Sequence, residues 1–215
     1  MDKQDKAVVY MLNSIVRSGL VSVASVLGVT CPPAGALASF MSWAWEESNA
    51  RDFHDELEER LRRIEREKVD EVYFNSDEFI SLFAQATETA SKTASDLKRQ
   101  ALAKALVNSL VTPTSELPGK QALLRVLSQM SDEEMIALSA LYKNVREGDS
   151  EITLFDLKNT IEAEWSHEDI AVAYEGLTQL GLALTRDFDH ELWKISTLGN
   201  RLIKWCSGEL YYHEV

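Results

Sequence analysis

The chain has 215 residues, of which 45% are hydrophobic and 27% are charged, and its formal net charge at pH 7 is −13. This length and composition are ordinary for a folded protein with one large domain or two small ones. Such an acidic chain repels the phosphate backbone, which disfavours general nucleic-acid binding. It also repels anionic membrane surfaces, apart from any apolar segment that inserts.

Cysteine usage and the N-terminus indicate the compartment. The two cysteines, Cys31 and Cys206, are far apart and form no CxxC pair, which favours free thiols in a reducing environment. The first residues interleave aspartates with lysines, and no small-residue cleavage site follows a compact apolar core, so we expect no signal peptide. We therefore expect a cytoplasmic protein. Membrane association through residues 7–47 is the alternative.

Residues 7–47 are predicted to form an apolar helical hairpin. Apolar side chains cover most of a helix over residues 7–27, and a Pro-Pro pair separates it from a second helix that starts near Ala34. Residues 18–45 carry no charged side chain. Four serines recur on one stripe of the first helix, and two tryptophans end the uncharged stretch, so the candidate residues of the hairpin are Ser14, Ser18, Ser22, Ser25, Trp43 and Trp45.

Three interpretations of this hairpin remain open. It is a buried core element, or it packs against copies of itself through the serine stripe, or it inserts conditionally into a membrane with Trp43 and Trp45 at the interface. The Pro-Pro pair leaves each helix too short to span a bilayer alone.

Residues 48–74 are predicted to form one amphipathic, highly charged helix. Phe53, Leu57, Leu61 and Ile64 follow helical spacing and form a narrow apolar seam, with charged residues on the other faces. The seam either packs on the body of the protein or forms a short coiled coil with a partner. These four residues are therefore the candidate interaction residues.

Residues 76–130 are predicted to complete a helical domain over residues 1–130. The first helix opens with a cap at Asn75 or Ser76, the second with a cap at Ser95, and a third starts near Gly119. The predicted buried positions are Phe79, Leu82, Phe83, Ala86 and Ala90 in the first helix and Leu102, Leu106 and Leu110 in the second.

Residues 131–207 change character. A capping box from Ser131 to Glu134 opens a helix, a short helix follows Thr153, and a third helix is capped by Ser166 and stopped by Gly181. The segments LALTRDF and HELWKIS are then predicted to form a small β-hairpin, and TLGNRLIKWC a closing helix. Residues 208–215 form a tail.

The phrase LTQLGLALTRDFDHELWKISTLGNRLIKW, at the end of this order of elements, resembles the winged-helix family. The resemblance implies a third helix that enters the major groove in DNA-binding members, with a wing that touches phosphates. Here that helix, residues 167–180, contains Glu168, Asp169 and Glu175 but no Lys or Arg, and the wing is also acidic. Phosphate contacts need cations, so the residues that would carry DNA binding are missing.

The layout of the whole chain, with the phrases KRQALAKALVNS and LSQMSDEEMIALSAL, resembles bacterial abortive-infection proteins of the Abi-alpha-like type. That resemblance implies a non-enzymatic effector or adaptor in phage defence, with action on the membrane as one form of it.

No motif points to catalysis. The four histidines, His54, His167, His190 and His213, share no metal-ligand spacing with each other or with the cysteines, and neither a phosphate-binding loop nor a GxSxG motif is present. We therefore expect a mainly α protein that is not an enzyme and uses no cofactor or metal. It is expected to bind a protein partner, itself included, in phage defence or a stress response. The alternatives are a membrane-perturbing effector and a DNA-binding winged-helix regulator.

Overall fold

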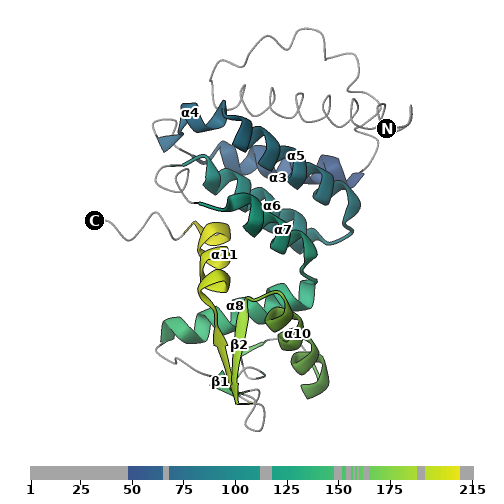
Figure 1. The fold of residues 1–215 in the computed structure, drawn as a ribbon. Coiled ribbons are helices and arrows are strands. Elements are labelled where there is room, and N and C mark those ends of the chain that lie inside the picture. Colours follow the sequence, from purple (N-terminus) through teal and green to yellow (C-terminus); the bar gives the residue numbers. More distant parts are fainter. Residues whose placement is uncertain are drawn as a thin grey trace, which may run out of the picture. The chain divides into compact units, whose positions relative to one another are not determined.

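A computed structural model of the chain describes residues 48–64, 68–111, 118–147, 152–153, 165–187 and 192–208, with single residues 156, 158, 160 and 161. The described chain is mainly helical and carries a small antiparallel sheet, which confirms the predicted class (Figure 1). It divides into two compact units. Unit 1 contains the described residues up to Leu124 with Gly208, and unit 2 is Arg125–Ser207. The predicted hairpin over residues 7–47 lies outside the described residues.

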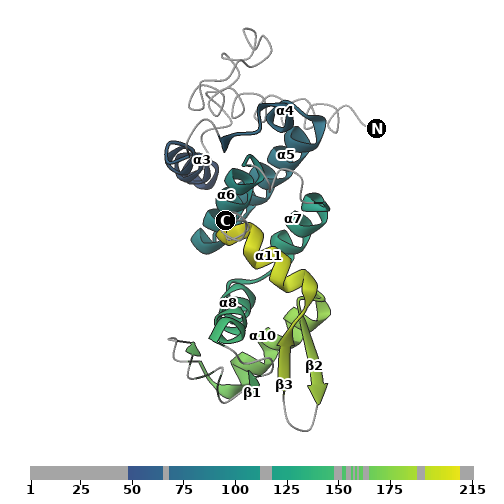
Figure 2. The same ribbon diagram turned by 90° about the vertical axis from the view of Figure 1, so that its left-hand side faces the viewer.

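Unit 1 is built around α3 (Ser48–Leu61), α5 (Asp77–Lys92) and α6 (Asp96–Ser109), which pack on one another (Figures 1 and 2). Helix α3 packs on α5 and α6, and α5 packs on α6 and on the short α4. The other described helices of this part of the chain are α4 (Glu71–Phe74) and α7 (Lys120–Gln129). The boundary between the two units falls within α7, after Leu124.

The helix predicted over residues 48–74 is wrong beyond Leu61, where α3 ends. After a turn, Val69 forms an isolated antiparallel bridge with Val111, and the amide of Asp70 donates to the Leu110 carbonyl oxygen at 2.8 Å. The Asp70 side chain then caps α4. Backbone hydrogen bonds to the segment at the end of α6 therefore take the place of helical hydrogen bonds at Val69 and Asp70. That segment is distant in the sequence, so the local pattern of residues 48–74 does not reveal it.

The caps predicted in unit 1 are confirmed. The Ser76 and Ser95 side chains accept from the amides of Phe79 and Lys98 and begin α5 and α6. All the predicted core positions are buried, namely Phe79, Leu82, Phe83, Ala86, Ala90, Leu102, Leu106 and Leu110. The core of unit 1 thus lies where the 3.6-residue period places it.

Unit 2 contains a three-stranded antiparallel sheet with strand order β1-β3-β2, where the sequence predicted a two-stranded hairpin. Its elements in chain order are α8 (Asp132–Glu147), β1 (Ile152–Thr153), α10 (His167–Gln179), β2 (Ala183–Asp187), β3 (Leu192–Ile195) and α11 (Thr197–Ser207). The strand that the sequence missed, β1, pairs Ile152 with Trp193 of β3. Two residues have no recognisable period, so only the pairing partner defines this strand.

Local signals in unit 2 are confirmed. Ser131 and Glu134 form the predicted capping box of α8, because the Glu134 amide donates to the Ser131 hydroxyl and the Ser131 amide to the Glu134 carboxylate. Ser166 caps α10, and Gly181 follows its end with φ of 72°, the left-handed conformation that favours glycine.

Tyr174 is one of the buried residues through which helix α10 packs on the sheet and on α8. The Tyr174 ring lies 5.2 Å from the Trp193 ring of β3, and its hydroxyl donates to the Ala137 carbonyl oxygen of α8 at 2.9 Å. Burial raises the pKa of the Tyr174 hydroxyl, so it stays a neutral donor. This side chain therefore contacts both of these elements.

Candidate functional site

The predicted interaction seam lies inside unit 1. Phe53, Leu57 and Leu61 are buried, and Ile64 follows the end of α3 and is half-buried. Of the two uses weighed from the sequence, packing on the body of the protein is the one in the structure, since α3 packs on α5 and α6. The seam therefore offers no surface to a partner while α3 is in place.

One buried position of α3 is titratable. His54 is 4% exposed, and its ring lies 5.6 Å from the Phe53 ring and 6.0 Å from the Phe83 ring of α5. Burial lowers the pKa of His54 from 6.5 to about 4, although Glu58 and Asp55 on the same helix act in the opposite direction. The imidazole is therefore neutral at pH 7.

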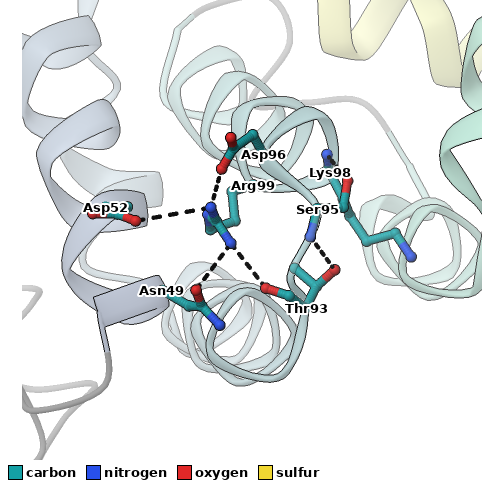
Figure 3. A network of polar contacts seen from close by, with 7 residues as sticks. All are labelled: Asn49, Asp52, Thr93, Ser95, Asp96, Lys98 and Arg99. Atoms are coloured by element: carbon teal, nitrogen blue, oxygen red, sulfur yellow. Dashed lines mark hydrogen bonds and ion pairs between the residues drawn. The ribbon is translucent and has the colours of Figure 1, made fainter.

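A polar network fixes the start of α3 (Figure 3). The guanidinium of Arg99, on α6, donates to the Asn49 side chain at 3.2 Å and to the Thr93 carbonyl oxygen at 2.9 Å. It also pairs with Asp96 and lies 3.8 Å from the Asp52 carboxylate. The network joins α3 to the turn between α5 and α6, so its role is architectural.

Sequence reasoning assigned no role to Arg99 or His54, although a signal existed. Arg99 precedes Leu102 by three residues and so falls on the buried stripe of α6, and His54 precedes Leu57 by three and falls on the seam of α3. A polar residue on an apolar stripe indicates a satisfied buried group. The partners on other helices, such as Asn49 of α3 for Arg99 and Phe83 of α5 for His54, are not visible in the local pattern.

A second cluster surrounds Lys120 at the start of α7. The side chain is 1% exposed, and its Nζ lies 3.8 Å above the Tyr73 ring and 3.8 Å from the Glu78 carboxylate. Burial lowers the pKa of Lys120 and, together with Glu78, raises that of the Tyr73 hydroxyl, which donates to Glu78 at 3.4 Å. Because the amine is covered, the cluster anchors α7 to α4 and α5 and presents no accessible nucleophile.

The outward face of α10 is the clearest exposed candidate in unit 2. Glu168, Val172, Glu175 and Gln179 recur at spacings of four, three and four and are all exposed, Val172 by 64%. The opposite face buries Ile170, Ala173, Tyr174 and Leu177. The stripe is therefore acidic with one apolar side chain near its centre, and α10 carries no Lys or Arg.

The remaining predictions concern metal binding, membrane insertion, the hairpin and the wing. Within those residues, no group of histidine, cysteine or carboxylate side chains is arranged to hold a metal ion. No helix in the same part of the chain is long and apolar enough to cross a membrane. The hairpin candidates and the tip of the predicted wing, residues 188–191, lie outside the described residues.

Comparison of the chain with models of protein families, with curated proteins and with solved structures found no match in any of the three. The winged-helix and abortive-infection resemblances therefore stand as hypotheses that these comparisons do not test.

Proposed function

We propose that the protein acts by binding another protein, without catalysis, and that unit 2 is a winged-helix-like module that presents α10 to this partner. The element order α8, β1, α10, β2, β3, α11 and the strand order β1-β3-β2 support a winged-helix-like arrangement. A role in phage defence is part of the proposal and rests on the resemblance of the sequence phrases alone.

The observation that carries the proposal is the chemistry of the exposed α10 stripe. In DNA-binding members of the winged-helix family, the corresponding helix lies in the major groove and needs cations nearby. Here the stripe offers Glu168 and Glu175 with the exposed Val172 between them. Carboxylates repel phosphates, whereas a partly apolar face with polar neighbours suits a protein surface.

The experiment is site-specific photo-crosslinking in the native host. A benzophenone amino acid replaces Val172 of the full-length chain, and in a control it replaces Val72 of α4, which is 85% exposed in unit 1. A discrete protein adduct at position 172 that is missing at position 72 is the expected result. No adduct at either position, or nucleic acid as the only adduct at position 172, contradicts the proposal.

The regulator hypothesis is tested separately by a gel shift with genomic DNA fragments at low salt. Protein binding through an acidic α10 predicts no shift. If the wild type does shift DNA, the variant Lys194→Gln in β3 is tested next. Loss of the shift in this variant would favour the regulator, because it would assign the phosphate contact to the sheet.

A further inference from the structure

The carboxylates on the outward face of α10 are not neutralised by neighbouring cations. Among the described residues, Glu168 and Glu175 form no ion pair, and both are exposed. Helix α3 is different, because each of three glutamates there pairs with the arginine four residues later, namely Glu56 with Arg60, Glu58 with Arg62 and Glu59 with Arg63. The charges of α3 therefore cancel within the helix, whereas those of α10 are left uncompensated.

A carboxylate of α8 extends this acidic surface. Glu134 lies against α10 at Gly176, since a Cβ added to that glycine would lie 2.0 Å from the Glu134 Oε1. Gly176 directly follows Glu175, so Glu134 adjoins the outward face of α10. We call the surface of Glu134, Glu168, Val172 and Glu175 the acidic face. Val172 is its apolar member and is 64% exposed, so two helices contribute carboxylates around one exposed apolar side chain.

The chemistry of the acidic face disfavours several classes of ligand. Nucleic acid and anionic membrane surfaces carry negative charge, which the carboxylates repel. A metal ion does not fit, because no group of histidine, cysteine or carboxylate side chains in the described part of the chain is arranged to hold one. A second copy would bring more negative charge, since Asp and Glu outnumber Lys and Arg by almost two to one over Arg125–Ser207. The face therefore suits a partner that brings both cations and an apolar side chain.

Building on the proposed binding role of α10, we propose that its partner is a basic protein segment in which Lys or Arg side chains flank an apolar residue. The apolar residue covers Val172, and the cations pair with Glu168 and Glu175, which precede and follow Val172 on the same stripe of the helix. These two glutamates are about 10 Å apart along the helix axis. Two cations about seven residues apart in a helix, or about three residues apart in a strand, span the same distance. Opposite charge speeds the encounter and disfavours acidic competitors.

Photo-crosslinking at position 172 of the full-length chain in the native host, followed by mass spectrometry of the adduct, identifies the segment that lies against α10. The same chain is then compared with the double variant Glu168→Gln and Glu175→Gln. The matched control is Glu59→Gln with Glu88→Gln, which removes the same charge from unit 1, where both glutamates have a basic partner. Near-ultraviolet circular dichroism of the purified proteins checks that they are folded. Glu175→Gln alone replaces the double variant if that protein folds poorly.

The expected result is a crosslinked segment with Lys or Arg on both sides of an apolar residue. The adduct yield should fall about fivefold in the double variant of α10, or about twofold in the single variant, and stay unchanged in the control of unit 1. A protein adduct on an acidic or uncharged segment overturns the inference and leaves the proposed function standing. Equal yields in the wild type and the α10 variant, or an equal fall in the control, also overturn it. If no protein adduct forms at position 172, the proposed function fails and the inference fails with it.

Discussion

Substituting Gly199 by alanine is expected to destabilise unit 2 strongly, although alanine is the better helix former. A Cβ added at this position of α11 would lie 2.3 Å from the Leu182 carbonyl oxygen and 3.1 Å from the Ile195 side chain. The Leu182 oxygen is already fixed, because the Ser196 amide donates to it at 2.9 Å, and the Gly199 amide donates to the Ser196 hydroxyl at 2.9 Å.

The magnitude follows from what has to move. Relieving the contact needs a backbone shift on the order of 1 Å, and overpacking of this kind costs about 1–3 kcal/mol. Weakening the hydrogen bonds of Ser196 adds about 1 kcal/mol. We expect a total loss of about 3 kcal/mol, measured by equilibrium urea denaturation with tryptophan fluorescence, and a fall in Tm of more than about 10 °C for a unit of this size.

Gly176 of α10 provides the matched control. A Cβ there would lie 2.0 Å from the Glu134 Oε1, which is the far end of a flexible side chain. That carboxylate can rotate away at the expense of its bond to the Ser131 amide, so Gly176→Ala should cost no more than about 1 kcal/mol. If Gly199→Ala stays within about 0.5 kcal/mol of the wild type, or if both variants lose the same stability, the steric reasoning is refuted.

Three further outcomes are expected. Arg99→Met should destabilise unit 1 by about 2 kcal/mol in urea denaturation and raise hydrogen exchange in the first turn of α3, while Gln100→Met, at an exposed position of the same helix, should change neither. Tyr174→Phe removes only the hydroxyl that donates to Ala137, so it should cost about 1 kcal/mol with unchanged near-ultraviolet circular dichroism; no loss would mean that the bond contributes nothing. His54→Leu should abolish a stability loss of up to about 3 kcal/mol that the wild type shows between about pH 6.5 and pH 4, and a parallel loss in both proteins would assign the acid sensitivity to other groups.

Part of the fold could be predicted because its signals are local. Ser76, Ser95, Ser131 and Ser166 each begin a helix through a bond to an amide three residues on. Gly181 follows the end of α10 because its positive φ suits glycine. The buried stripes of α5 and α6 follow from a period of 3.6 residues. All of these features depend on contacts within a few residues of each other along the chain.

The candidate sites were less predictable. Charge composition alone indicated that α10 lacks the cations for phosphate contact, and its exposed stripe agrees with that reading. The seam of α3 was also visible in the sequence, but the choice between a partner and the body of the protein was not. In the structure α3 packs on α5 and α6, and Phe53, Leu57 and Leu61 are buried.

The sequence by itself determined where most helices begin, which faces are apolar and which charges are absent, because these depend on short-range bonds and on periodicity. Only the tertiary structure decided that α3 ends at Leu61, that Ile152 and Thr153 form a strand, and that Asn49 of α3 is a partner of the buried Arg99. Each of these outcomes depends on a partner distant in the sequence, such as Val111 for Val69 and Trp193 for Ile152. Backbone groups and buried polar side chains must be satisfied, and long-range neighbours supply what local structure does not.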